Sequence, residues 1–329
     1  MLRFIGKRIL LMLPTLVIVS LIGFLIIQAP PGDYVTSYVA AMQAQGDLVD
    51  QDEVEGLRAR FGLDQPIYVQ YWRWASNFLR GELGYSLALH QPVAEIVKSR
   101  LPASFAITLL SMLLVYAIGI PIGILSATKQ YSIQDYVFTV IGFLGVATPR
   151  FMLALVGLWA IYQSTGKAAL GLYSTPAMQN APFSLAKGLD LLSHLWLPAL
   201  ITGMAGTAGL IRTMRANLLD ELPKPYVTVA RARGVAPTKL LYKYPLRIAL
   251  NPVISTIGYT LPHLLEGEVL VSLVLGLPTL APVLLSSLLQ QDMLLAASII
   301  MIEAVLVLIG TLISDMLLAV VDPRIRGSI

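Results

Sequence analysis

Long apolar runs alternate with polar stretches along the whole chain. Six of the runs reach about 20 residues, which is the length that an α-helix needs to cross the hydrocarbon core of a bilayer. The pattern therefore predicts an all-α integral membrane protein with six transmembrane helices. We place these spans near residues 9–28, 103–127, 134–162, 194–216, 251–276 and 294–321.

The first apolar run follows Arg3, Lys7 and Arg8, as the apolar region of a signal peptide follows its basic start. However, the run continues to Ile27, which is too long for a signal peptide, and it has no small-residue cleavage site. We therefore interpret it as a retained span.

Basic residues flank the predicted spans on one side. Lys and Arg concentrate in the short cytoplasmic segments of membrane proteins, so we expect both termini in the cytoplasm. Segments 29–102, 163–193 and 277–293 should then be external, and the first of them is acidic, with Asp47, Asp50, Asp52, Glu53 and Glu55. The basic residues on the cytoplasmic side are Arg3, Lys7, Arg8, Lys129, Arg212, Arg215, Lys224, Arg231, Arg233, Lys239, Lys243, Arg247, Arg324 and Arg326.

The external segment 29–102 is too long for a simple connection between two spans. Within it, residues 62–87 place apolar residues at helical spacing, with the aromatic residues Tyr68, Tyr71, Trp72 and Trp74 among them. Aromatic residues favour the headgroup level of a bilayer. We expect an amphipathic helix along the outer membrane face, in contact with lipid or packed over the outer end of the bundle.

Composition agrees with a membrane protein. Hydrophobic residues make up 56% of the chain, charged residues make up 13%, and the mean hydropathy is +0.74. The sequence contains no cysteine, which excludes disulfides, thiolate metal sites and a cysteine nucleophile. The net charge of +4 is modest, and because the basic residues lie beside spans we do not expect nucleic acid as a partner.

Small and helix-weakening residues are frequent inside the spans. Gly119 and Gly123 have the spacing that lets two membrane helices approach closely. Ordinary packing within the bundle explains most such residues, although a kinked bundle also suits a protein that changes conformation.

Five ionisable residues interrupt the fifth and sixth apolar runs. A carboxylate facing lipid would cost on the order of 3 kcal/mol at mid-bilayer, so each should face protein or water. Either a polar lining of a solute path or a structural pair with a neighbouring subunit would explain them, and a proton relay is a third possibility. The residues are His263, Glu266, Glu268, Glu303 and Asp315, and we expect a structural role for Asp315.

The segment 217–250 forms a basic cytoplasmic loop with two helices. Pro223 and Pro225 should end the fourth span, and a short helix should follow from Tyr226 to Arg233. Gly234 can adopt the left-handed conformation that reverses a chain. Pro237 suits the first turn of a second helix, which should return to the membrane.

On that second helix, basic and apolar residues occupy adjacent faces. Lys239, Lys243 and Arg247 recur every four residues, beside an apolar strip of Leu240, Leu241, Tyr244 and Ile248. Two helices joined by a glycine turn can also bind DNA, but the flanking spans hold this pair at the membrane and no base-reading side chains are evident. We expect one face of the second helix to lie on the bundle and the other to meet lipid headgroups or a soluble protein partner.

At these residues the chain resembles the membrane permease subunits of ATP-binding-cassette importers of the oligopeptide/dipeptide type. Their cytoplasmic loop carries a Glu-Ala-Ala-x-x-x-Gly element whose short coupling helix docks on an ATPase subunit. Here the corresponding stretch is Thr228-Val229-Ala230-Arg231-Ala232-Arg233-Gly234. Thr228 replaces the glutamate, and Pro225 replaces an acidic residue before Tyr226, so salt bridges with the ATPase are not carried over.

Further motifs extend the resemblance over nearly the whole chain and occur in the same order. Where the family has Glu-Thr-x-Phe and Trp-Pro-Gly-Leu-Gly, this chain has Ser272 to Ala281 with Glu266 and Glu268 upstream, a change at the outer mouth that bears on the solute. The matching motifs are Pro31-Gly32-Asp33, Gly62-Leu63-Asp64-Gln65-Pro66, Gly81-Glu82-Leu83-Gly84-Tyr85-Ser86, Arg100-Leu101-Pro102-Ala103-Ser104, Gly119-Ile120-Pro121-Ile122-Gly123 and Asp322-Pro323-Arg324-Ile325-Arg326.

The resemblance implies that the chain is driven from outside itself. No G-x-x-x-x-G-K-[ST] phosphate loop occurs, so we expect the chain not to be an enzyme and to hold no cofactor, with ATP and magnesium bound by two separate ATPase subunits. A second, different permease should complete the path and a solute-binding protein should deliver cargo, in the inner membrane of a bacterium or archaeon. The residues implied in coupling are Tyr226, Val227, Thr228, Val229, Ala230, Arg231, Ala232, Arg233 and Gly234, supported by Lys239 and Lys243; those implied in the path are His263, Glu266 and Glu268; and none is implied as a metal ligand.

We divide the chain into the N-terminal flank and first span (1–28), an external segment (29–102), a permease core (103–321) containing the coupling loop (217–250), and a cytoplasmic tail (322–329). Oligopeptides are the expected cargo, with oligosaccharides as the alternative. An ion-coupled secondary transporter is a second alternative, although no internal repeat is evident.

Overall fold

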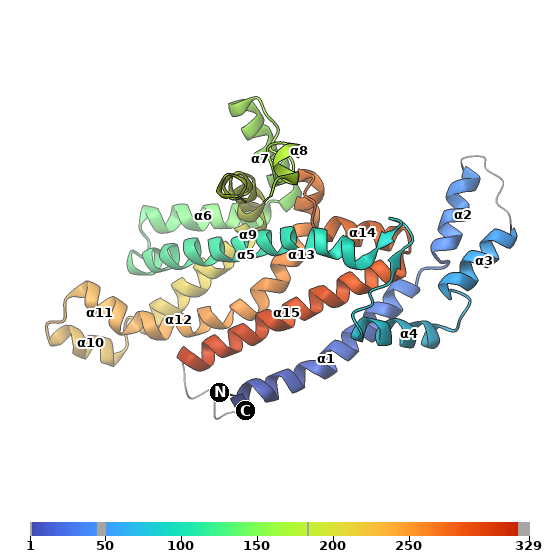
Figure 1. The fold of residues 1–329 in the computed structure, drawn as a ribbon. Helices are drawn as coiled ribbons and strands as arrows, with labels where there is room; N and C mark the ends of the chain where they lie inside the picture. Colours follow the sequence, from blue (N-terminus) through green and yellow to red (C-terminus); the bar gives the residue numbers. More distant parts are fainter. Residues whose placement is uncertain (1, 45–50, 183, 322–329) are drawn as a thin grey trace. The chain divides into compact units, whose positions relative to one another are not determined.

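The computed structural model describes residues 2–44, 51–182 and 184–321 as a predominantly helical chain (Figure 1). The acidic residues Asp47 and Asp50, and the tail 322–329 with its arginines, lie outside the described residues. One short antiparallel pair joins β1 (Tyr85–Ser86) to β2 (Gln91–Pro92). The helices are α1 (Leu2–Gln28), α2 (Tyr34–Ala44), α3 (Gln51–Phe61), α4 (Ile67–Leu79), α5 (Val93–Thr128), α6 (Ile133–Ala147), α7 (Arg150–Thr165), α8 (Pro176–Asn180), α9 (Leu185–Glu221), α10 (Pro225–Ala232), α11 (Pro237–Lys243), α12 (Pro245–Ser255), α13 (Ile257–Leu275), α14 (Leu280–Leu289) and α15 (Met293–Val321).

Four helices in the described part of the chain are long and apolar enough to cross a membrane. They comprise Ile5–Gln28, Val93–Thr128, Leu185–Glu221 and Met293–Ala319. The number rises to six if α6 with α7, and α13 with α14, each count as one broken span. The structure therefore confirms a mostly helical chain with four to six candidate membrane spans.

The third predicted span, 134–162, is not one continuous helix, and this part of the prediction is wrong. Helix α6 ends at Ala147, α7 begins at Arg150, and the two are bent by 108°. The break lies at Thr148, whose backbone is extended with φ −87° and ψ 127°. Pro149 explains it, because a proline disfavours the helical conformation of the residue before it.

The second cytoplasmic helix is also interrupted. We expected one helix from Pro237 back into the membrane, but α11 ends at Lys243 and α12 begins at Pro245. Tyr244 between them has φ −113° and ψ −82°, again immediately before a proline. A further break at Thr256 separates α12 from α13 within the predicted span 251–276.

The chain folds into two compact units. The first unit comprises Met1–Ile5, Ala103–Pro278 and Ile309–Ile329, and the second comprises Gly6–Pro102 and Thr279–Leu308. Within the first unit, α9 packs against α6, α7, α12 and α13. Met214 and Leu218 on α9 are completely buried, so this helix forms the centre of the first unit.

Gly119 and Gly123 bring α5 against α9, as their spacing predicts. A Cβ atom added at Gly119 would lie 2.8 Å from Leu210 Cδ2, and one added at Gly123 would lie 2.6 Å from Met214 Cβ. These distances are shorter than real contacts between carbon atoms. Only glycine therefore permits this approach of the two helices.

In the second unit, α4 is the amphipathic helix predicted within residues 62–87. Trp74 on its inner face is 6% exposed and packs against Phe24 of α1. Tyr68, Trp72 and Leu79 lie together on another face and are 73% to 87% exposed. An exposed aromatic face of this kind is typical of helices at a membrane surface.

Asp33 starts α2 in the same unit. Its carboxylate accepts hydrogen bonds from Thr36 N at 2.7 Å and from Thr36 Oγ1 at 2.6 Å, and it pairs with Arg58 Nε at 3.2 Å. Burial raises the pKa of Asp33, but the hydrogen bonds from Thr36 and the charge of Arg58 outweigh burial and leave the pKa below its usual value. The Pro31-Gly32-Asp33 motif thus has a structural role as a helix cap.

The close approach of α5 and α9 predicts different outcomes for two Gly→Ala substitutions. Gly123→Ala should destabilise the protein by about 1–3 kcal/mol, because the new methyl group overlaps Met214. Gly209→Ala on α9 is the matched control, since nothing lies within 4 Å of its added Cβ. Thermal unfolding of both variants in detergent measures the difference, and equal melting temperatures would contradict the packing argument.

Candidate functional site

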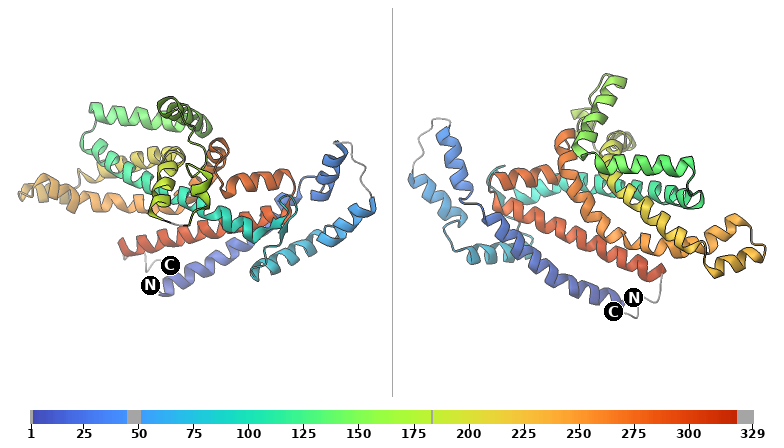
Figure 2. Two further views of the ribbon diagram at one scale, coloured as in Figure 1. Left: turned by 45° about the horizontal axis from the view of Figure 1, so that its top comes forward. Right: turned by 180° about the vertical axis from the view of Figure 1, so that it is seen from behind.

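Helices α10 and α11 form a hairpin beyond the ends of α9 and α12 (Figure 2). Pro225 occupies the first turn of α10, where its missing N–H costs no hydrogen bond. Gly234 follows the helix with φ +78°, the left-handed conformation that its lack of a Cβ permits. The short helix predicted for 226–233 is therefore present one residue earlier, at 225–232.

One face of α10 is anchored and the other is uncovered. Val227 and Ala230 are buried against Leu240 of α11. Thr228, Val229, Arg231, Ala232, Arg233 and Gly234 are exposed within this chain, Val229 to 51%. An apolar side chain flanked by two arginines is a surface suited to a protein partner.

Tyr226 ties the start of α10 to the end of α9. Its hydroxyl donates to Glu221 Oε2 at 2.5 Å, and Lys224 Nζ lies 3.0 Å from Glu221 Oε1. Burial, and then the hydrogen bond to the Glu221 carboxylate, raises the pKa of Tyr226 well above its usual value. Tyr226 thus stays protonated and keeps donating its hydrogen bond to Glu221. This bond connects the start of α10 to the end of α9.

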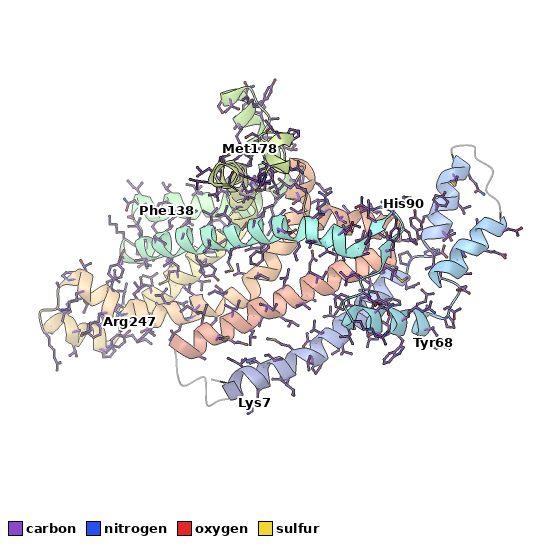
Figure 3. All side chains as sticks on the ribbon, in the orientation of Figure 1. Lys7, Tyr68, His90, Phe138, Met178 and Arg247 are labelled. Carbon is purple, nitrogen blue, oxygen red and sulfur yellow. The ribbon has the colours of Figure 1, made fainter. Side chains whose placement is uncertain are left out.

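Helix α11 presents its basic residues outward. Lys239, Lys243 and Arg247 at the start of α12 are exposed, whereas Leu240 between them is buried. Figure 3 labels Arg247 among the side chains of this region. A groove of about 980 Å³ runs between this hairpin and the end of α5. Its walls include Ile124, Thr128, Leu222, Arg231, Val235 and Tyr242.

Glu268 is a buried carboxylate in the first unit. It is 1% exposed, and it accepts hydrogen bonds from Ser104 Oγ at 3.0 Å and from Thr108 Oγ1 at 3.4 Å, both on α5. Within this chain it therefore links α13 to α5. The side chains of His263 and Glu266 lie outside the described residues, and the role of these three residues in a solute path stays a prediction.

Arg150 is a charged residue within a predicted membrane span that the sequence analysis did not name. It lies inside the apolar run 134–162, where a search of that run for ionisable residues would have found it. It begins α7 directly after the Pro149 break and lines a cavity of about 170 Å³. Thr202, Gly206, Gly209, Thr213, Thr256 and Thr260 form much of the remaining wall.

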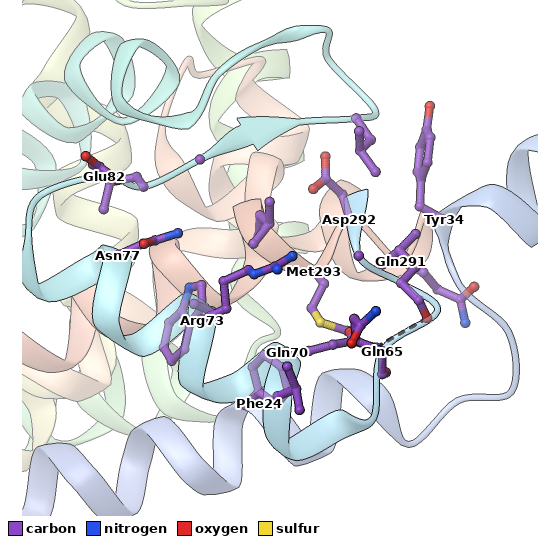
Figure 4. A pocket seen from close by; sticks show the side chains of 18 residues that line it. Phe24, Tyr34, Gln65, Gln70, Arg73, Asn77, Glu82, Gln291, Asp292 and Met293 are labelled. Atoms are coloured by element: carbon purple, nitrogen blue, oxygen red, sulfur yellow. Dashed lines mark hydrogen bonds between the residues drawn. The ribbon is translucent and has the colours of Figure 1, made fainter. Parts of the chain in front are cut away.

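A second cavity, of about 120 Å³, lies in the second unit between α4 and the start of α15 (Figure 4). Arg73, Trp74 and Asn77 line its α4 side, and Met293 lines the other. The Trp74 indole Nε1 is buried and has no hydrogen-bond partner among the described residues. Glu82 and Asp292 also line this cavity, so its wall offers both donors and acceptors of hydrogen bonds. Among residues 2–44, 51–182 and 184–321, no three His, Asp or Glu side chains are grouped to hold a metal ion.

Comparison with known families matches both parts of the chain. Residues 119–327 match the binding-protein-dependent transport system inner membrane component, and residues 1–108 match the N-terminal region of such membrane components. The chain belongs to this family of transport permeases. The resemblance inferred from its motifs is confirmed, and the permease is a multi-pass inner membrane protein that works as one subunit of an import system.

Individual relatives cover the permease almost completely. It is 35% identical over 329 residues to the oligopeptide transport system permease protein AppB of Bacillus subtilis, covering 99% of this chain and 100% of the relative. A putative peptide permease protein of Brucella ovis is 32% identical over 327 residues, 99% of each chain. The glutathione transport system permease protein GsiC of Escherichia coli K12 is also 32% identical over 327 residues, 99% of each chain.

The buried position of Glu268 predicts how two substitutions differ. Glu268→Ala removes the acceptor of two α5 hydroxyls and leaves a void, so it should destabilise the permease by at least about 2 kcal/mol. Glu268→Gln keeps a carbonyl oxygen in the same place and should cost less. Thermal unfolding in detergent tests the order, and a loss for Gln as large as that for Ala would contradict the role of the carbonyl acceptor.

Proposed function

We propose that the permease forms half of the translocation path of an ATP-driven importer. A second, different permease completes the path, two cytoplasmic ATPase subunits bind ATP and magnesium, and an extracytoplasmic binding protein delivers the cargo. The family match over both parts of the chain supports a subunit of this kind. Energy then enters through contacts with the ATPases.

The observation that carries the proposal is the geometry of α10. Val227 and Ala230 hold the helix to α11, while Thr228, Val229 and Arg231 stay uncovered. When a partner displaces the outer face of an anchored helix, the elements packed against that helix move with it. A loosely held helix would move alone. We therefore assign α10 as the coupling helix that docks on an ATPase subunit.

Helix α9 would carry the displacement into the membrane. It has 37 residues, which corresponds to roughly 55 Å at 1.5 Å per residue. The Glu221 carboxylate binds both Lys224 and Tyr226 at the joint with α10. Farther along, α9 forms a wall of the Arg150 cavity. A push on α10 would thus tilt α9 and change the cavity that it lines.

We infer that the cargo is peptide. The names of the relatives refer to oligopeptide, peptide and glutathione transport. Oligosaccharides, the alternative suggested by the altered outer mouth, have no counterpart among these names.

Reconstituted vesicles test this function. Vesicles with both permeases, both ATPases and loaded binding protein should accumulate labelled peptide when ATP is supplied, and vesicles without the ATPases should accumulate none even with a cation gradient. Uptake driven by the gradient alone would instead identify an ion-coupled transporter, and uptake of oligosaccharide but no peptide would overturn the assigned cargo.

The exposed apolar residue of α10 provides a test of coupling. Val229→Asp should lower ATP-driven uptake by about tenfold or more, because it places a carboxylate in a contact that excludes water. Val229→Ile keeps the apolar surface and should transport normally. Ala230 is a poorer test site, since a bulky residue there would also break the packing on Leu240.

Uptake and ATP turnover should both be measured for the two Val229 variants, with thermal unfolding as a check on folding. Because Val229 is exposed, neither variant should lose stability. Normal uptake by folded Val229→Asp would rule out docking through this face of α10.

A further inference from the structure

The Arg150 cavity lies entirely within the first unit and has a positive wall. Its lining contains one arginine, threonines, glycines and leucines, and no Asp or Glu among the described residues. Those residues also offer the Arg150 side chain no hydrogen bond or ion pair. An arginine inside a membrane segment is costly unless it faces water or a partner. The cavity therefore suits an anion.

The hydroxyl groups of the wall differ in what they can still bind. Thr213 donates to the carbonyl of Gly209 at 3.0 Å, and Thr260 donates to the carbonyl of Thr256 at 2.7 Å. Thr202 is 1% exposed, and its hydroxyl has no partner among the described residues. Thr202 thus holds a free donor, buried in the same wall as Arg150.

Glycine opens the remaining wall. A Cβ added at Gly209 would meet nothing within 4 Å, so this part of α9 leaves space rather than packing against a neighbour. The volume of about 170 Å³ is similar to the ~150 Å³ of an engineered cavity that binds benzene. It therefore suits the end of a solute rather than a whole oligopeptide.

We propose that Arg150 and Thr202 bind the terminal carboxylate of a peptide during its passage. This inference rests on the proposed peptide transport. A guanidinium can donate two parallel hydrogen bonds to a carboxylate, and the Thr202 hydroxyl can donate a third. A C-terminal carboxylate occurs in every unmodified peptide, so a site for it accepts peptides of any side-chain sequence. Since Thr202 belongs to α9, movement of this helix would displace a ligand of the site.

Matched peptides test the site in vesicles containing the complete importer. One labelled peptide has a free C-terminal carboxylate and the other carries a C-terminal amide. Each is supplied at a concentration that saturates the binding protein, so that its affinity for the two peptides does not affect the uptake rates. Arg150→Gln should lower the ratio of carboxylate to amide uptake by about tenfold, because only the carboxylate uses the guanidinium. Arg150→Lys should retain part of the ratio. Thr202→Val should lower the ratio several-fold without loss of stability.

Thr207→Val is the matched control on the same helix, because the Thr207 hydroxyl donates to the carbonyl of Gly203 and does not line the cavity. Stimulation of ATP turnover by loaded binding protein shows that each variant is assembled. If Arg150→Gln fails to assemble, the uptake ratio of the Thr202→Val variant tests the site instead.

Two outcomes would overturn the site. An unchanged ratio in assembled Arg150→Gln or Thr202→Val, including one in which uptake of both peptides falls by the same factor, would assign these residues to structure alone. If the wild-type importer moved both peptides but the variants kept its ratio, peptide transport would stand and only the carboxylate site would fall. If the wild type moved neither peptide, both proposals would fall together.

Discussion

The close packing of α5 on α9 is the constraint on which the rest of the first unit depends. Lipid chains are as apolar as leucine side chains, so the hydrophobic effect does little to join helices within a bilayer, and van der Waals contact must do so. Gly119 and Gly123 permit that contact by leaving room for Leu210 and Met214. Because α9 also packs on α6, α7, α12 and α13, its position determines where those helices lie.

The same helix joins the two proposed binding places, helix α10 and the Arg150 cavity. At one end, Glu221 holds α10 through Tyr226 and Lys224. Farther along, Thr202 and Gly209 form part of a polar cavity. A continuous helix satisfies its backbone hydrogen bonds internally and is stiff, so these two places can be coupled without a chain of side-chain rearrangements. Such coupling suits a subunit that an import system drives from outside.

Prolines create two of the helix breaks in the bundle. Pro149 bends the third apolar run and leaves Arg150 at the start of α7. Pro245 turns the chain out of α11 and into α12, which returns against α9. In both places the residue before the proline leaves the helical conformation. The cost of an interrupted helix in a membrane is tolerable only where protein or water satisfies the freed backbone groups.

The order of residues alone predicted the membrane class, the amphipathic helix of the external segment, the short helix ending before Gly234 and the family. Each of these depends on local signals, namely the length of an apolar run, helical spacing, or a glycine or proline at a turn. The interruptions at Thr148 and Tyr244 were missed even though their prolines are visible, because apolar periodicity continues across them and prolines also occur within intact membrane helices such as α1.

Only the folded chain shows what each polar residue contacts. Glu268 was expected in the solute path, but its hydrogen bonds to Ser104 and Thr108 depend on residues 160 and more positions away. The Arg150 cavity likewise gathers its wall from α7, α9 and α13, and from Thr256 between α12 and α13. The local sequence determines which segments are helices, but the partners of a buried charge depend on how those helices pack, and that packing brings together residues far apart in the chain.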